Sequence, residues 1–182
     1  MTILHGALVG LFVWSGIGAQ VTETVSFPAR ESFIEITSVR VTGYNAVPEQ
    51  TDNDPHVTAS GAKSNPEVVV ARSRDLAEEL PFGTVVELRA PTDKHSCGFE
   101  QVEHLIGYRV ITDTMHSRKE HQIDILFDKA DTVSLGEKKV NPAVALGICN
   151  VTVRVIGKID VKDIPSTQTD LAILVNKTLA LK

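Results

Sequence analysis

Two aspartates stand inside segments that otherwise have the pattern of apolar strands: Asp113 in ITDTM and Asp124 in QIDIL. An aspartate in such a strand is disfavoured, and it is costly to bury unless it is paired or functional. A polar turn separates the two segments, so the carboxylates can face each other across a hairpin, where both would not ionise easily and one pKa should rise. A protonated carboxyl beside an ionised one is what general acid catalysis on a sugar bond requires. The alternative is that each aspartate only caps a turn at the end of its strand.

The elements that would position these carboxylates are short. Alternating or continuous apolar runs predict strands over 33–46, 67–71, 83–90, 108–115, 122–128 and 151–157. In the first run the apolar phase shifts between Ile36 and Val39, which indicates a bulge. Capping and stop signals predict short helices over 74–80, 142–147 and 168–180, and the polar segment 91–107 is interpreted as a long hairpin insertion. Many short strands with few helices indicate an all-β barrel.

Three short motifs occur in a characteristic order: TASG at 58–61, PFGT at 81–84 and the Ile-Asp pair at 123–124. With the strands around them, they resemble the bacterial 3D (three-aspartate) domain family, and the likeness covers residues 37–157. Members of that family are similar to the barrel of MltA-type lytic transglycosylases and, more distantly, to RlpA-like proteins and expansins. The resemblance implies a six-stranded double-psi β-barrel with a few short helices that acts on peptidoglycan glycan strands.

The resemblance also assigns roles to three aspartates. By position, Asp124 matches the catalytic acid proposed for the family, and Asp113 matches a second family aspartate. Asp75 is the nearest candidate for the third. Since Ile123 and Ile125 flank Asp124, the alternation of a strand places the Asp124 side chain on the face opposite theirs.

Four further residues are candidates for binding substrate. Met115 and His116 stand where the family has two glycines, which let a backbone approach a ligand closely. This departure alters the expected substrate geometry, although His116 can itself hydrogen-bond a sugar or a carboxylate. Thr58 and Ser60 can hydrogen-bond a sugar, or they can simply satisfy their own loop. Arg118, with Lys119 beside it in the basic turn SRKEH, can meet the acidic peptide stems of peptidoglycan or lie on a solvated hairpin tip.

These residues favour one function and leave a second open, and a third possibility is a barrel that serves only as a platform for protein interactions. The first is a lytic transglycosylase-like enzyme that cleaves peptidoglycan glycan strands. In it Asp124 acts as acid and then as base, while Asp113 positions it and raises its pKa. The second is a non-catalytic, expansin-like module that binds cell-wall glycan, which the missing glycines favour. Neither function requires a metal or a cofactor, and the histidines show no metal-ligand spacing.

The two ends of the chain differ from its centre. Residues 6–19 are apolar and uncharged, which suits the core of a signal peptide but is too short for a membrane span. We therefore expect a signal peptide over 1–19, a linker over 20–32, a barrel over 33–157 and a docked helical extension over 158–182. A buried N-terminal strand or helix is the alternative for 6–19. Export would place the protein in the periplasm or at the cell wall, where Cys97 and Cys149 can form a disulfide.

The charge distribution limits the expected partners. The formal net charge is -5 and no run of basic residues occurs, which argues against nucleic-acid binding. No dinucleotide fingerprint, phosphate-binding loop or Ser-His-Asp motif is present. The sequence therefore predicts a monomer without a stable membrane span, whose partner is the peptidoglycan glycan.

Overall fold

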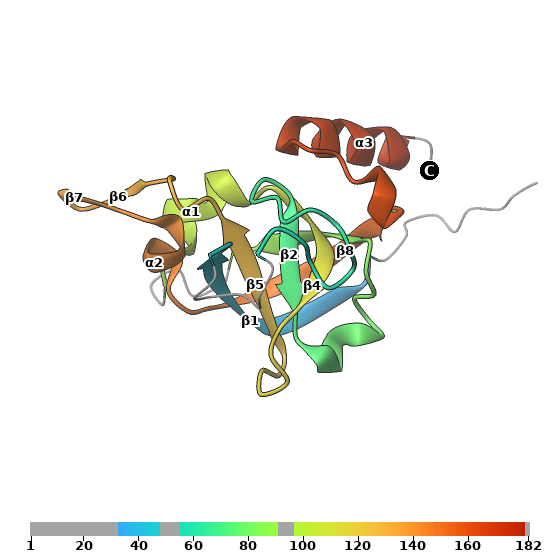
Figure 1. Cartoon of the computed structure of the whole chain (residues 1–182), viewed down its shortest axis with the longest axis horizontal. Helices are drawn as coiled ribbons and strands as arrows, with labels where there is room; N and C mark the ends of the chain where they lie inside the picture. The colour runs from blue at the N-terminus through green and yellow to red at the C-terminus, as the bar shows by residue number, and fades with distance from the viewer. Residues whose placement is uncertain (1–32, 48–54, 91–96, 181–182) are drawn as a thin grey trace, which may run out of the picture. The chain divides into compact units, whose positions relative to one another are not determined.

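The computed structural model describes residues 33–47, 55–90 and 97–180, and six strands in these ranges close into a barrel (Figure 1). They are β1 (Glu35–Asn45), β2 (Val69–Arg72), β3 (Thr84–Arg89), β4 (Tyr108–Thr114), β5 (Gln122–Phe127) and β8 (Cys149–Lys158). Around the barrel they follow the order β1, β5, β2, β4, β3, β8. The predicted bulge is present, because the pairing of β1 with β8 shifts register between Ile36 and Val39. The predicted fold class is therefore confirmed.

The strand order interleaves the two halves of the chain. β1 pairs with β5 and β2 pairs with β4 in parallel, whereas the remaining barrel pairs are antiparallel. If β1, β2 and β3 are exchanged with β4, β5 and β8, respectively, the order around the closed barrel stays the same when it is read in the opposite direction, so the two halves of the chain contribute equivalent strands. β4 and β5 follow each other along the chain, but β2 lies between them and pairs with both. The predicted hairpin between them is therefore wrong.

A hydrophobic cluster fills the barrel interior, and the strands contribute alternate residues to it. Ile123 and Ile125 of β5 and Ile111 of β4 are fully buried members of this cluster. Asp124 lies between two of these inward positions, so its side chain faces the outside of the barrel, as the alternation predicts.

Two short helices pack against each other beside β1 and β5 (Figure 1). α2 (Pro142–Leu146) lies where the Asn-Pro start signal predicts it. α1 (Phe99–Ile106) corrects the interpretation of 91–107 as a hairpin insertion. Its buried residues are Phe99, Val102 and Ile106. This spacing forms one apolar stripe on a helix, with polar and charged residues on the opposite face, which is the pattern of an amphipathic helix.

The C-terminal segment packs on the outside of the barrel. The 3-10 helix η2 (Val161–Asp163) leads to α3 (Gln168–Ala180), the helix predicted for this segment. Leu171 and Val175 of α3 are buried in an outer hydrophobic cluster that includes Leu126 of β5. Burying apolar surface in this way ties the segment after the barrel to the strands that carry the candidate site.

The remaining elements are small. The 3-10 helix η1 (Arg74–Ala77) occupies the first part of the helix predicted over 74–80. β6 (Val133–Leu135) and β7 (Lys138–Val140) form a separate hairpin that the sequence patterns did not indicate. Its turn includes Gly136 at a φ of 61°, a conformation that favours glycine.

The two cysteines form the predicted disulfide. The Cα atoms of Cys97 and Cys149 lie 5.4 Å apart, and the bond joins the residues before α1 to the start of β8. The predicted signal peptide over 1–19 and linker over 20–32 lie outside the described residues. In the part of the chain that the structure describes, no helix is both long and apolar enough to cross a membrane.

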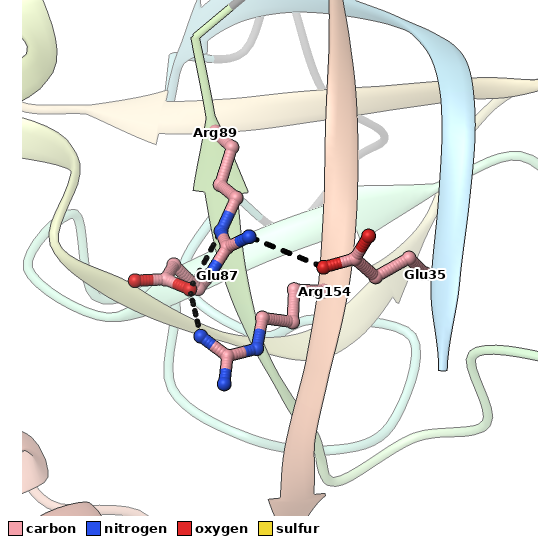
Figure 2. A network of polar contacts seen from close by, with 4 residues as sticks. All are labelled: Glu35, Glu87, Arg89 and Arg154. Atoms are coloured by element: carbon pink, nitrogen blue, oxygen red, sulfur yellow. Dashed lines mark hydrogen bonds and ion pairs between the residues drawn. The ribbon is translucent and has the colours of Figure 1, made fainter. Parts of the chain in front are cut away.

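The outer surface of β1, β3 and β8 carries a network of ion pairs (Figure 2). A carboxylate oxygen of Glu35 lies 3.2 Å from a guanidinium nitrogen of Arg89. One oxygen of Glu87 lies 3.2 Å from Arg89 and 3.1 Å from Arg154. Acidic and basic side chains alternate along this network, so each of its carboxylates has a basic partner.

Candidate functional site

The two central aspartates lie on the outer surface of the barrel, on either side of β2. Ala71 of β2 pairs with Asp124 of β5 in one direction and with Asp113 of β4 in the other. Neighbouring strands lie about 4.8 Å apart, so the backbones of the two aspartates are about 10 Å apart. The residue between them carries only a methyl group. The carboxylates are therefore neighbours across a third strand rather than partners in a hairpin.

A bulge in β4 decides which way Asp113 points. Ile111 and Asp113 pair with consecutive residues of β2, so Thr112 is the extra residue on β4. Regular alternation from the inward-facing Ile111 would turn Asp113 into the barrel interior as well. The bulge turns the carboxylate outward instead, to the same face as Asp124.

Three donors hold the Asp113 carboxylate. The Tyr44 hydroxyl donates to Oδ2 at 3.4 Å, and the backbone N–H groups of Ala59 and Thr114 donate to Oδ1 at 2.9 and 2.8 Å. Ala59 belongs to the TASG motif at 58–61, which therefore closes over the end of β4. Backbone donors of this kind fix a carboxylate in one orientation.

Asp124 is held by a chain of two hydrogen bonds. The Thr42 hydroxyl donates to Oδ1 of Asp124 at 2.8 Å, and the Gln122 side-chain amide donates to the Thr42 oxygen at 3.0 Å. Thr42 and Asp124 are direct partners in the parallel pairing of β1 with β5. Since the amide proton occupies one side of the Thr42 oxygen, the hydroxyl hydrogen is directed towards the carboxyl group.

Burial raises the pKa of Asp124 to about 6. The Thr42 hydrogen bond and the charge of Lys119 act in the opposite direction, and the charge of Asp113 adds the smallest of these effects. The predicted rise is therefore present, but its main cause is burial and not the second carboxylate. The separation of about 10 Å between the two backbones explains the weak coupling. At pH 6 about half of the molecules carry a proton on Asp124.

The charges of both aspartates act on the hydroxyl group of Tyr44. Burial raises the pKa of its hydroxyl, and the charges of Asp113 and Asp124 raise it further, so the group remains protonated and donates to Asp113. The sequence-based prediction missed Thr42, Tyr44 and Gln122 as neighbours of the carboxylates. A signal was present in VTGY, because residues two apart on a strand share one face.

Asp75 lies apart from these carboxylates, in η1. Its Oδ2 accepts a hydrogen bond from the backbone N–H of His121 at 2.8 Å. Burial acts to raise the pKa of Asp75, but hydrogen bonds from Ser73 and from the His121 backbone hold it below its ordinary value. His121 has a φ of 50°, in the left-handed region, and directly precedes β5. Asp75 therefore stabilises the start of the strand that carries Asp124.

Thr58 and Ser60 bond mainly within their own loop. Thr58 is buried, and its hydroxyl lies 3.2 Å from the Ala62 carbonyl, to which it donates, and 3.1 Å from the Ser60 hydroxyl. The backbone N–H of Ser60 donates to the Thr112 carbonyl at 3.0 Å. Of the two interpretations of Thr58, loop stabilisation is the one that its contacts support. Ser60 also borders a cavity, which we consider below.

The turn between β4 and β5 carries His116, Arg118 and Lys119, which the sequence offers for contact with a ligand. His116 and Arg118 are exposed, and Nδ1 of His116 accepts a hydrogen bond from the Arg118 backbone at 3.2 Å. Met115 is buried, and its N–H donates to a carbonyl of β2 at 2.9 Å. Lys119 is the residue of this turn whose charge acts on Asp124.

The site thus contains the carboxyl group of Asp124, whose pKa is raised to about 6, and the carboxylate of Asp113, which accepts hydrogen bonds from three donors. Among the residues that the structure describes, no group of three or more His, Cys, Asp or Glu side chains is placed to hold a metal ion. No protein-family model matches the chain, and no curated protein matches its sequence. What can be said of the site therefore depends on the geometry of this chain.

Proposed function

We propose that this protein cleaves the glycan strands of peptidoglycan as a lytic transglycosylase, with Asp124 as general acid and base. The observation that carries the proposal is the state of Asp124, a largely buried carboxyl group on a strand whose pKa is raised to about 6. Such a group carries a proton at mildly acidic pH and exchanges it readily. The resemblance to the 3D-domain family supports glycan as the substrate, and the six-stranded barrel agrees with the fold of that family.

The proposed reaction consumes no water. Asp124 gives its proton to the glycosidic oxygen while the bond between that oxygen and the anomeric carbon breaks. The carboxylate then takes the proton of the sugar's own 6-hydroxyl, whose oxygen bonds to the anomeric carbon and closes an anhydro ring. One carboxyl group serves as acid and then as base, and it ends the cycle protonated, as it began.

In this proposal the groups around Asp124 position it and complement the transition state. The Thr42 hydroxyl orients the carboxyl group, so that the free oxygen carries the proton outward. Asp113 provides a fixed negative charge on the same face of the barrel, held by Tyr44 and the Ala59 amide. Negative charge there stabilises the positive charge that develops at the anomeric carbon.

A non-catalytic module that binds wall glycan is the second candidate. The observation that favours it is the segment after Asp113, where the side chains of Met115 and His116 stand in place of two family glycines. Side chains at these positions keep a ligand further from the backbone than glycines would. In that case both carboxylates accept hydrogen bonds from sugar hydroxyls and transfer no proton.

Incubation with purified sacculi separates the two candidates. Soluble products are analysed by mass spectrometry, and bound protein is measured after the sacculi are pelleted. Release of anhydro-muropeptides that disappears in Asp124→Asn supports the enzyme. Binding without release supports the module, and failure to bind sacculi at all contradicts both.

Either function requires export to the periplasm or the cell wall. The disulfide between Cys97 and Cys149 supports this location, because disulfides persist mainly in oxidising compartments. Recovery of the protein in a periplasmic extract tests the location, and thiol titration of that protein after denaturation tests the disulfide. Finding both thiols free would contradict the disulfide.

A further inference from the structure

A cavity of about 590 Å³ lies beside the loop that holds Asp113. One of its walls is formed by residues 60–65 and another by residues 160–166, which belong to the C-terminal segment. Its lining includes two lysines, one aspartate, a serine and apolar residues: Ser60, Lys63, Asp160, Val161, Lys162 and Ile164. Because two lysines stand against one aspartate, the cavity combines a net positive charge with an apolar surface.

The cavity and the carboxylates share one loop. The backbone N–H of Ala59 donates to Asp113, and the next residue, Ser60, lines the cavity. Consecutive Cα atoms are about 3.8 Å apart, so the cavity begins within one residue of the group that fixes Asp113. A polymer lying across Asp113 and Asp124 can therefore place a side branch in the cavity without leaving the surface.

One hydrogen bond joins the two walls of the cavity, and a second fixes the helix that follows one of them. The Asn65 side-chain amide donates to the Ser166 carbonyl at 2.8 Å, which joins the loop to the C-terminal segment. The Gln168 side-chain amide donates to the Tyr108 carbonyl at 2.7 Å, which fixes the start of α3 on β4. A cavity whose walls are tied together in this way is preorganised for a ligand.

The charges around the cavity are available to an incoming ligand. Lys63 is exposed and makes no hydrogen bond or ion pair within the described ranges. Lys162 lies 3.3 Å from Asp160, but these side chains are 75% and 57% exposed, so the pair is weak and easily exchanged. Two ammonium groups favour carboxylates, and the partly exposed Val161 and Ile164 in the same lining favour small apolar side chains.

We propose that this cavity binds the acidic peptide branch of the polymer whose glycan lies across the two aspartates. The proposal rests on the function proposed above, and it names the part of peptidoglycan that sets specificity: a short peptide with free carboxylates and small apolar side chains. Lys63 and Lys162 bind the carboxylates, and Val161 and Ile164, which line the cavity and are partly exposed, contact the apolar side chains. The C-terminal segment, which lies outside the range of the family resemblance, thereby becomes part of the substrate site.

Binding of the full chain to two forms of purified sacculi at low salt tests the proposal. One form is intact, and the other has lost its stem peptides to an amidase. We expect the wild-type protein to bind the intact form more tightly. Lys63→Gln and Lys162→Gln should each weaken binding to the intact form by about two- to fivefold and leave binding to the stripped form unchanged.

Two more variants sharpen the test. Asp160→Asn keeps the oxygen that accepts the Lys162 N–H but removes a negative charge, so it should strengthen binding to intact sacculi. Lys138→Gln, in β7, removes the same charge as the lysine variants away from the cavity and should have no effect. Thermal unfolding checks that every variant is folded.

The possible failures are distinguishable. If the wild type binds both forms equally and neither lysine variant changes binding, the cavity does not recognise the peptide, while the proposed action on glycan stands. If the wild type binds neither form, the proposed function is wrong, and this inference falls with it. A loss of binding in Lys138→Gln as large as in Lys63→Gln would show a non-specific charge effect and would also overturn the inference.

Discussion

Carboxylates occur on two parts of the barrel's outer surface, and their surroundings are unlike. On β1, β3 and β8, Glu35 and Glu87 contact guanidinium groups at 3.1–3.2 Å (Figure 2). On β4 and β5, Asp113 and Asp124 accept hydrogen bonds from hydroxyl and amide groups, and within the described residues no ion pair joins them to a basic side chain. Glu35 and Glu87 thus have basic partners in ion pairs, whereas Asp113 and Asp124 have none among the described residues.

Ion pairing of Glu35 and Glu87 and burial of Asp124 have different consequences. Exposed ion pairs are screened by water and contribute about 0–1 kcal/mol each, so the network of Glu35, Glu87, Arg89 and Arg154 can only help the strands to stay together. Burial without a basic partner raises the pKa of Asp124 to about 6, within the range where proteins use proton transfer. A strand carboxylate is therefore a candidate for chemistry because of what surrounds it, not because of its residue type.

The largest expected effect is that of Asp124→Asn on turnover. The amide keeps the shape of the side chain, and its oxygen can still accept the Thr42 hydrogen bond, but it has no proton to give. We expect the rate of anhydro-muropeptide release to fall by about 10²–10⁴-fold. Product release is followed by mass spectrometry, and circular dichroism checks the fold.

Glu87→Gln is the matched control for this variant, because it makes the same carboxyl-to-amide change within the ion-pair network. Its activity should stay within about twofold of wild type. A loss of less than about tenfold for Asp124→Asn, in a folded variant of an active protein, would mean that another group is the acid.

The second effect concerns stability and pH. The pKa of an aspartate is about 3.9 in an unfolded chain, whereas that of Asp124 in the folded protein is about 6. Between these values the folded protein binds more protons than the unfolded chain, so Asp124 makes stability fall as pH rises from about 4 to 6. Asp124→Asn should therefore be more stable than wild type at pH 7, by about 1–3 kcal/mol, and nearly equal to it below pH 4. Urea unfolding at both pH values measures this difference, and a difference that does not vary with pH would contradict the raised pKa.

The third effect is a smaller shift of the pH profile, in opposite directions for two variants. Activity should decline as pH rises above about 6, because the acid then loses its proton. Asp113→Asn removes a like charge and should move this decline to lower pH, whereas Lys119→Gln removes an opposite charge and should move it to higher pH. We expect shifts of about half a pH unit or less. Shifts in the same direction for both variants would contradict the assignment of Asp124 as the titrating group.

The smallest effect on stability is expected in the ion-pair network of Glu35, Glu87, Arg89 and Arg154. Arg89→Ala removes its contacts to Glu35 and Glu87, but the Arg89 side chain is 47% exposed. We expect a loss of about 0.2–1 kcal/mol in the free energy of unfolding, and a smaller loss at high salt. Chemical denaturation at low and high salt measures both values. A loss of several kcal/mol would show that the network is needed to close the barrel.

Much of the fold could be predicted because its signals are local. Apolar runs located the barrel strands, and the phase shift between Ile36 and Val39 located a bulge. The Asn-Pro start signal located α2. α1 was missed, although the spacing of its buried residues, with charged residues between them, is that of an amphipathic helix and was a usable signal. The outward direction of Asp124 followed from strand alternation, but the neighbours that act on it did not.

By itself, the sequence determined which segments become the six barrel strands, where η1, α2 and α3 lie, and that Cys97 has one possible partner. The tertiary structure decided that β2 separates β4 from β5, that an extra residue in β4 turns Asp113 outward, and that burial sets the pKa of Asp124. The physical reason is the range of the interactions. Alternation and capping depend on residues a few positions apart, whereas the bond from Thr42 to Asp124 joins residues 82 positions apart, and only the closed barrel brings them together.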